Sequence, residues 1–218
     1  MMKKMDIIYE DKELLVVNKP AKKLTIATQK KEINTLYHEA REYIKKQNPK
    51  NKIFIVHRLD KDTSGVVLFA KSEKLKKLLQ DNWNSYEREY LAIVDGVVKG
   101  KRKIKSYLVE TKSLDVYSTN DSKKGKLAIT NYESLAFNKS YSLLKINIET
   151  GRRNQIRVHM SDMKHPITGD KKYHSKNNPL NRMGLHASSL KIIHPITKKE
   201  MCFVAKTPAV FKNMFDNV

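Results

Sequence analysis

Short apolar runs separated by polar turn residues make up most of the chain and predict a protein rich in β-strands. The segment 141–149 alternates Leu144, Ile146 and Ile148 with polar residues, the pattern of a strand with one buried face. Further runs occupy residues 6–10, 13–18, 53–56, 66–70, 90–98, 127–136, 188–194 and 200–205. Because most neighbouring runs are separated by short turns, we expect hairpin connections and a mostly antiparallel sheet.

Helical spacing of apolar residues predicts four helices, at 34–47, 73–82, 154–163 and 208–215. Asn34 or Thr35 is expected to cap the first helix, and Ser72 the second. In the second helix, Leu75, Leu78 and Leu79 are expected to face inward. Strands with a few helices packed on them predict an α+β fold with a central, mostly antiparallel mixed sheet.

The chain of 218 residues contains no internal repeat and no low-complexity linker, so we expect a single domain spanning 1–218. Residues 99–126 are polar and rich in lysine, with only weak strand signals near 104–109. They are the best candidate for an insertion. Residues 165–183, rich in Lys, Asn, Pro and Gly, are expected to be irregular.

The charge of the chain points to a polyanionic partner. Lys and Arg number 44 against 23 Asp and Glu, which gives a formal net charge of +21. Nucleic acid is the expected partner, because each phosphate contact draws on Lys and Arg and releases counterions. A solvated, lysine-rich surface without such a partner is the alternative, and the excess of lysine over arginine keeps it open.

Cysteine usage and hydropathy restrict the class of protein further. Cys202, the single cysteine, lies in the apolar run 201–205 and is expected to be a buried thiol. No Cys/His cluster has zinc spacing, so we expect no metal site. No leader and no membrane-spanning run is evident, and a cytoplasmic protein is expected.

The most informative segment for chemistry is 56–65, which places Asp60 after a short strand and next to the cationic Arg58. A turn is expected at 63–65, before the apolar run 66–70. A lone aspartate at such a position is usually a turn former. An acidic group in a strongly basic protein repels an anionic partner, however, unless chemistry requires it.

A second cationic segment, 151–160, begins with a glycine turn and continues into a predicted helix. On that helix Arg153 and Arg157 would be four residues apart and would share a face. Such a segment suits recognition of anions or base edges. Solvated arginines at the start of a surface helix are the alternative interpretation.

The string His57 to Gly65 resembles the active-site motif of the RluA-type pseudouridine synthases. Four further stretches resemble the same family in the same order. They are Leu15–Ala21, Glu89–Gly96, Thr150–Met160, and Leu185-His186-Ala187 followed by Leu190 and His194-Pro195. Together the five matches extend from residue 15 to about residue 208, nearly the whole chain. Five matches in order are far more specific than any one of them.

The resemblance implies the pseudouridine synthase catalytic fold and the isomerisation of uridine to pseudouridine in ribosomal or transfer RNA, without cofactor or metal. It implies that Asp60 is the catalytic aspartate, acting as nucleophile or base at the ribose of a flipped-out uridine. It assigns Tyr90 to packing against the uracil. It assigns Arg157 to pairing with Asp60, where a cation would keep the carboxylate ionised.

The remaining assignments concern RNA contact. Arg58 matches an arginine that enters the space left by the flipped nucleotide. The other basic and polar motif residues expected to contact RNA are His57, Arg152, Arg153 and Gln155. The chain departs from the family pattern at Arg153-Asn154, where Thr-His is usual, at His174, where Gly is usual, and at Lys22-Lys23, in place of a Gly-rich turn.

No space for an S4-type RNA-binding domain is expected before residue 6, so RNA specificity should come from the catalytic domain. A monomer is expected. Two other readings compete. A non-catalytic RNA-binding or ribosome-assembly protein would not need Asp60, Tyr90 and Arg157. A glycoside hydrolase using Asp60 and Asp62 is disfavoured because two carboxylates in one tight turn rarely converge on a substrate.

Overall fold

The computed structural model of the chain describes residues 5–27 and 34–215. The expectation that no leader is present rests partly on residues 1–4, which lie outside the described residues. The chain groups into two compact units: the first comprises Met1–Tyr86 and Ala187–Lys206, and the second comprises Glu87–His186 and Thr207–Val218. Both units combine antiparallel strands with a few helices, which confirms the predicted α+β class.

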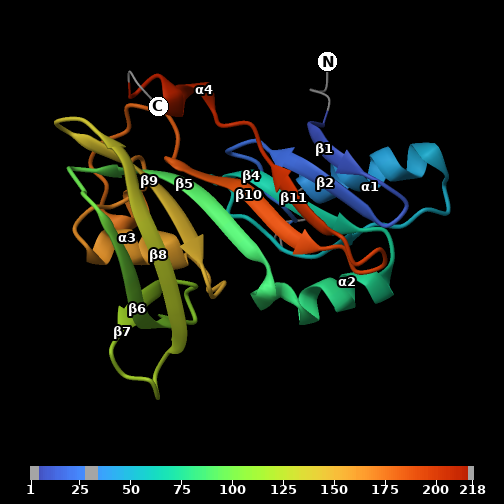
Figure 1. The fold of residues 1–218 in the computed structure, drawn as a ribbon, viewed down its shortest axis with the longest axis horizontal. Helices are drawn as coiled ribbons and strands as arrows, with labels where there is room; N and C mark the ends of the chain where they lie inside the picture. The colour runs from blue at the N-terminus through green and yellow to red at the C-terminus, as the bar shows by residue number, and fades with distance from the viewer. Residues whose placement is uncertain (1–4, 28–33, 216–218) are drawn as a thin grey trace. The chain divides into compact units, whose positions relative to one another are not determined.

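The first unit is built on strands in the order β1–β2–β4–β10, with β3 paired to β4 and β11 paired to β10 (Figure 1). The bounds are β1 Ile7–Glu10, β2 Leu14–Lys19, β3 Phe54–Ile55, β4 Ser64–Ala70, β10 Leu185–Ile193 and β11 Glu200–Val204. The pairs β1–β2 and β10–β11 are antiparallel hairpins, as predicted. In β2, Leu14 to Val17 are all inaccessible to solvent, so both faces of this strand are covered.

The helices of the first unit begin at the predicted caps. In α1 (Leu36–Gln47) the Thr35 hydroxyl accepts a hydrogen bond from the backbone N–H of His38. In α2 (Glu73–Asp81) the Ser72 hydroxyl accepts from the backbone N–H of Leu75. These bonds satisfy N–H groups that have no partner within the helix.

The inward orientation predicted for Leu78 is wrong, because this side chain is 38% exposed. Leu75 and Leu79, four residues apart, lie one above the other on the buried face of α2 and join the core of the unit. The core-facing stripe of this short helix is therefore narrower than the run of leucines suggested.

The turn predicted at 63–65 lies earlier, at Lys61 and Asp62, and Gly65 belongs to β4. Gly65 has φ +117°, and a Cβ there would come within 2.1 Å of the carbonyl oxygen of Ala187. The glycine is required because two backbones approach closely, not because the chain reverses direction.

Burial of Cys202 is also a wrong prediction, because its side chain is exposed. Side chains alternate between the two faces of β11, and Phe203 and Ala205 take the buried face. The apolar run 201–205 predicts a buried strand, whereas alternate residues of the run are exposed.

The second unit carries strands in the order β5–β9–β8–β6–β7 (Figure 1). Their bounds are β5 Glu87–Asp95, β6 Lys101–Glu110, β7 Val116–Thr119, β8 Lys126–Phe137 and β9 Tyr141–Ile148. All four pairings along this order are antiparallel. Helix α3 (Gln155–Asp162) packs Ile156 and Met160 into the core formed with Ala92 and Ile146.

Residues 99–126, for which only weak strands are expected, form regular strands. β6 is ten residues long and pairs with both β7 and β8. Leu108, Val116 and Ala128 of these strands form a small core with Val158 and Tyr173. Few apolar residues of this segment are buried, and many of the positions between them are lysines, so the strand pattern is weak in the sequence.

The remaining helical elements of the described residues are short. The 3₁₀ turns are η1 (Trp83–Ser85) in the first unit and η2 (Lys171–Tyr173) in the second, where α4 (Ala209–Lys212) also lies. The segment 165–183 is irregular apart from η2, as predicted. Within the described residues, none of the helices has the length and apolar composition that a bilayer crossing requires.

Candidate active site

The turn that carries Asp60 is anchored on both sides of this residue by buried side chains of the first unit. On one side, the hydroxyl of Thr25 donates to the carbonyl of Leu59 at 2.7 Å and accepts from its N–H at 3.2 Å. On the other, the ammonium group of Lys19 donates to the carbonyl of Lys61 at 3.0 Å. The Asp60 carbonyl itself accepts from the N–H of Thr63 at 3.2 Å. This turn therefore holds the backbone of a half-buried carboxylate in a defined position.

Lys19 is inaccessible to solvent, although it carries a charged group. Its Nζ donates to the carbonyls of Pro20 at 3.1 Å and Lys23 at 2.7 Å, in addition to Lys61. A buried ammonium is stable only when its donors find partners. Lys19 thus connects the end of β2 to the turn that bears Asp60, and nothing in the sequence reasoning assigned it this task.

We expect Lys19→Met to lower the free energy of unfolding by about 2–4 kcal/mol, because three carbonyls lose the hydrogen bonds of the buried ammonium while the volume of the side chain is nearly kept. Denaturant unfolding measures the change. Lys12→Met, at an exposed position of the same unit, is the control and should change stability by less than about 0.5 kcal/mol. Equal stability of the two variants would contradict this account of Lys19.

The neighbours of Asp60 occupy different environments. His57 stacks on Trp83 with ring centroids 4.4 Å apart, and its Nε2 accepts from the N–H of Leu68 at 3.1 Å. Arg58 and Asp62 are exposed. His57 is therefore built into the first unit, whereas Arg58 presents its charge to solvent.

Tyr90 lies in β5 of the second unit and is half-buried against the core that contains Ile156 and Met160. Tyr86, which the sequence alone could not separate from Tyr90, is only 7% exposed and belongs to the core of the first unit. Burial raises the pKa of Tyr86 above its usual value. Of these two tyrosines, Tyr90 is the more exposed to solvent.

The turn before α3 is ordered by Gln155, which is 3% exposed. Its Oε1 accepts from the hydroxyl of Thr150 at 2.8 Å and from the N–H of Arg152 at 3.0 Å. Its Nε2 donates to the carbonyl of Ile129 at 2.9 Å and to Thr130 Oγ1 at 3.0 Å. These bonds give Gln155 a structural task, and RNA contact stays a prediction for this residue.

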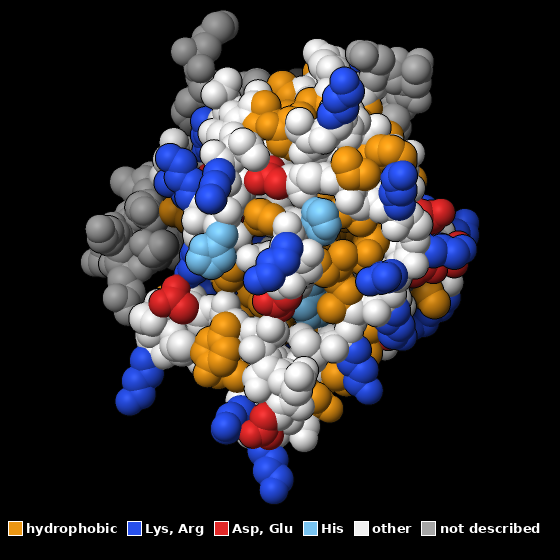
Figure 2. Space-filling model, turned by 90° about the vertical axis from the view of Figure 1, so that its left-hand side faces the viewer, with side chains coloured by type: hydrophobic (Ala, Val, Ile, Leu, Met, Phe, Trp, Pro, Cys, Tyr) orange, Lys and Arg blue, Asp and Glu red, His pale blue; other side chains and the backbone are white. Residues whose placement is uncertain are grey.

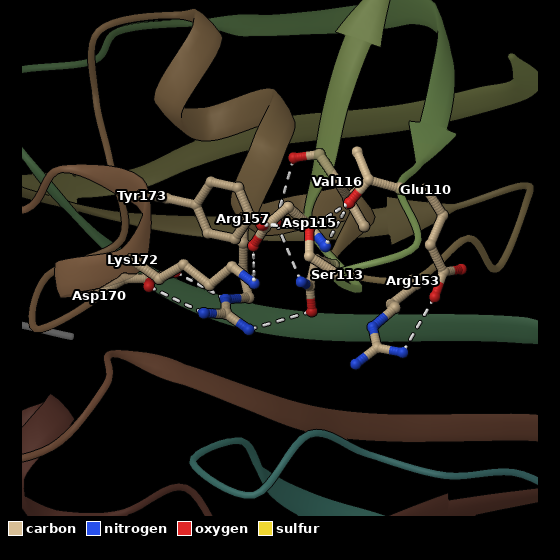
Figure 3. Close-up of polar contacts among 11 residues, drawn as sticks. Glu110, Ser113, Asp115, Val116, Arg153, Arg157, Asp170, Lys172 and Tyr173 are labelled. Atoms are coloured by element: carbon tan, nitrogen blue, oxygen red, sulfur yellow. Dashed lines mark hydrogen bonds and ion pairs between the residues drawn. The ribbon is translucent and has the colours of Figure 1, made fainter. Parts of the chain in front are cut away.

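The two arginines expected on one helical face do not share the helix. Arg153 precedes α3, and its guanidinium pairs with Glu110 of β6 at 3.0 Å, with both side chains more than 40% exposed. Arg157 lies within α3 and pairs with Asp170 (Figure 3). Because the helix begins at Gln155, a spacing of four residues does not place Arg153 and Arg157 on one helical face.

Sequence reasoning missed three polar residues of these regions: Lys19, Arg88 and Asp170. Arg88, 4% exposed, lies two residues before Tyr90 on β5 and donates to the carbonyls of Ile148 and Glu149 at 3.2 and 3.0 Å. Burial lowers its pKa from the usual value. The spacing of two along a strand could have placed Arg88 on the same face as Tyr90.

His159 of α3 is a buried histidine of the second unit. Its Nε2 lies 2.9 Å from Ser106 Oγ and its Nδ1 lies 2.9 Å from Thr130 Oγ1. Burial lowers the pKa of His159. The neutral ring is therefore the form that the folded protein favours.

We expect the free energy of unfolding to fall as the pH drops below about 6.5, because the unfolded chain binds a proton at His159 that the folded chain does not. For this residue alone the slope approaches about 1.4 kcal/mol per pH unit. Urea unfolding at pH 7.5 and 5.5 measures it, and His159→Gln is the control, since its amide does not titrate. The same pH dependence in both proteins would assign the effect to other groups.

The predicted site residues divide between the two units. Asp60, His57 and Arg58 belong to the first, and Tyr90, Arg152, Arg153, Gln155 and Arg157 belong to the second. The structure brings Arg157 together with Asp170 and Asn154. The pairing of Arg157 with Asp60 joins residues of different units and stays a prediction.

Comparison with known proteins identifies the family. Residues 13–162 match the family model described as RNA pseudouridylate synthase. The chain is 32% identical to tRNA pseudouridine synthase C of Haemophilus ducreyi over 97% of this chain and 95% of the relative. It is 34% identical to ribosomal large subunit pseudouridine synthase D of Zymomonas mobilis over 97% of this chain and 72% of the relative.

A solved structure shares the fold. Human RNA pseudouridylate synthase domain containing 4 superposes with a TM-score of 0.78 at 23% identity, over 94% of this chain and 90% of that one. At this identity the likeness concerns the fold alone, and it agrees with the pseudouridine synthase catalytic fold expected from the motifs. Taken with the matched family model and the relatives above 30% identity, these findings show that the chain belongs to the RluA-type RNA pseudouridine synthases, which are isomerases.

Proposed function

We propose that the enzyme converts one or more uridines of ribosomal or transfer RNA to pseudouridine, with Asp60 acting on a flipped-out uridine. The relatives named for transfer RNA and for the large ribosomal subunit support both substrate classes. The reaction breaks the bond between uracil N1 and ribose C1′, turns the base and joins C5 to C1′; C5 releases its proton to solvent and N1 takes one up, so the net change is an isomerisation. The carboxylate of Asp60 serves as nucleophile or base at the ribose.

The observation that carries the assignment of Asp60 is the anchored turn. Leu59 and Lys61, the residues on either side of Asp60, are held by the buried side chains of Thr25 and Lys19. A turn whose aspartate served only to reverse the chain would not need such anchors. A reacting carboxylate does, because a misplacement of about 1 Å costs about a hundredfold in rate.

We assign Tyr90 to packing against the uracil and Arg157 to the Asp60 carboxylate. A guanidinium beside the carboxylate would orient it through charge-assisted hydrogen bonds. The half-buried ring of Tyr90 supports its role, because a stacking partner must leave part of its surface accessible.

RNA binding is proposed to rest on the basic surface. Figure 2 shows Lys and Arg side chains spread over one face of the molecule rather than gathered in one patch. Residues 99–126 carry nine Lys and Arg against Glu110, Asp115 and Asp121, a net charge of 9 − 3 = +6. These residues and 165–183 are the candidates for RNA specificity. The proposed contacts to phosphate are Arg58, Arg152 and Arg153, and His57 and Gln155 are proposed as further RNA contacts. We further propose a monomeric, single-domain, cytoplasmic enzyme without metal or cofactor.

The experiment that tests the activity is tritium release from RNA labelled at uracil C5. Release from cellular RNA, followed by mapping of pseudouridine with and without this gene, would identify the target uridine. No release from any cellular RNA, beside an active pseudouridine synthase as positive control, would favour a non-catalytic RNA-binding protein with this fold.

A further inference from the structure

Arg157 is held by an acid that the sequence motifs leave without a role. Its Nε donates to Asp170 Oδ2 at 2.7 Å and its Nη2 donates to Asp170 Oδ1 at 2.9 Å (Figure 3). The side chains of Arg157 and Asp170 are 14% and 2% exposed. Two parallel bonds from one guanidinium to one carboxylate fix the plane of the guanidinium as well as its position.

Two further residues complete the fixation of Arg157. Asn154 Oδ1 accepts from Nη1 at 3.0 Å, and Asn154 Nδ2 donates to the hydroxyl of Tyr173 at 3.0 Å. The guanidinium carbon lies 4.9 Å from the centre of the Tyr173 ring. The Tyr173 hydroxyl donates to the carbonyl of Val116 at 3.2 Å. Contacts at the edge and over the face of the guanidinium leave Arg157 little freedom to reorient.

The positions of Asp170 and Asn154 are themselves fixed. The N–H of Asp170 donates to the carbonyl of Ile167, and its carbonyl accepts from the N–H groups of Tyr173 and Ser175. Asn154 has φ +52° at the N-terminus of α3, a left-handed conformation that asparagine tolerates better than most residues. Its side chain makes no cap bond to the helix and is directed to Arg157 and Tyr173 instead.

We propose that Asp170 is a positioning residue for pseudouridine formation, which acts by holding Arg157, with Asn154 and Tyr173 completing the arrangement. The inference rests on the proposed role of Arg157. An arginine side chain loses rotamer entropy when it is ordered. Asp170 ensures that this ordering is complete before RNA binds. The ordered guanidinium then presents its N–H donors in one fixed direction.

The alternative is that the pair only stabilises the second unit, and the kinetics of Asp170→Asn separate the two readings. The amide keeps the shape of the carboxylate but replaces one acceptor oxygen with an NH₂ donor. We expect kcat to fall by about tenfold to a hundredfold, because a misplaced group costs rate rather than affinity. The dissociation constant for RNA should stay within about twofold. Glu200→Gln, which removes the charge from an exposed ion pair with Lys191, is the control and should leave both quantities unchanged.

A double-mutant cycle with Arg157→Lys tests whether Asp170 acts through Arg157. If it does, Asp170→Asn should reduce kcat by less than about threefold in the Arg157→Lys background. If the losses of kcat in the two single variants multiply in the double variant, the proposal is overturned. A normal kcat for Asp170→Asn beside an impaired Arg157→Lys would also overturn it. A normal kcat for Arg157→Lys and Arg157→Ala would instead remove the proposed role of Arg157.

A readout independent of turnover is the NMR signal of the arginine Nε–H groups, in which the Arg157 resonance is assigned by its loss in Arg157→Lys. In the wild type we expect the Arg157 Nε proton to exchange slowly with water. In Asp170→Asn we expect its chemical shift to move toward that of the exposed arginines. An unchanged resonance would overturn the positioning role even if kcat falls. A wild type without activity on any RNA would overturn the proposed function and the catalytic part of this inference, while the resonance still reports on the fixation of Arg157.

Discussion

Replacing Asp60 by asparagine is expected to reduce pseudouridine formation by about 10⁴-fold or more, because an amide can neither attack the ribose nor accept a proton from it. The two side chains have nearly the same shape, and the backbone anchors at Leu59 and Lys61 do not involve the carboxylate. The fold should therefore be unaffected. Tritium release from RNA labelled at uracil C5 measures the rate, and a filter-binding titration measures RNA affinity.

Asp62→Asn is the control for Asp60→Asn, because Asp62 is exposed and lies two residues along the same turn. It changes the charge of the turn by the same amount and should leave the rate within about twofold, since an exposed charge that does not contact the reacting atoms acts mainly on encounter. If both variants lose activity equally, the effect belongs to local charge and not to a reacting carboxylate. If Asp60→Asn keeps its activity, the assignment of Asp60 is wrong.

RNA affinity distinguishes two further explanations of an inactive Asp60 variant. Removal of a negative charge from a basic surface should leave affinity unchanged or raise it slightly, because the carboxylate repels phosphate. A large loss of affinity would instead indicate that Asp60 orders the RNA-binding surface. The expected combination is a lost rate with retained binding, which is the behaviour of a group that acts mainly in the transition state.

The sequence predicted those parts of the fold that depend on local interactions. Thr35 and Ser72 begin their helices because a hydroxyl before a helix satisfies N–H groups of the first turn, and this depends on neighbours in sequence alone. Cys202 was misplaced because the face that β11 buries is set by its partner β10. Gly65 was misassigned to a turn because its close approach to Ala187 links residues more than a hundred positions apart.

In the candidate site, too, local sequence features are predictable and long-range contacts are not. Motif resemblance selects Asp60, Tyr90 and Arg157 but gives no partner within the second unit for Arg157. Asp170 lies thirteen residues further along the chain, and only the irregular segment 165–183 brings it to α3. Lys19 was likewise seen only as part of a motif, because its three carbonyl partners are revealed by tertiary structure. Roles that depend on long-range contacts therefore need the structure.

Replacing Arg157 by alanine is expected nearly to abolish turnover, while RNA affinity is mostly retained. Without the guanidinium, the Asp60 carboxylate would lose the partner that is proposed to orient it. Loss of this orientation acts on the chemical step, so kcat should fall much more than affinity. Single-turnover kinetics with saturating enzyme measure the chemical step, and an equal loss of affinity would contradict a catalytic role.

Stability complicates the Arg157→Ala variant, because Asp170 is 2% exposed and would lose its bidentate partner. An uncompensated buried charge costs about 3–5 kcal/mol. The double variant Arg157→Ala/Asp170→Asn removes that charge, so we expect it to regain much of the lost stability. If Arg157 acts on the reaction, this stabilised protein must remain inactive. Recovery of turnover together with stability would show that Arg157 serves the fold of the second unit and that another cation acts on Asp60.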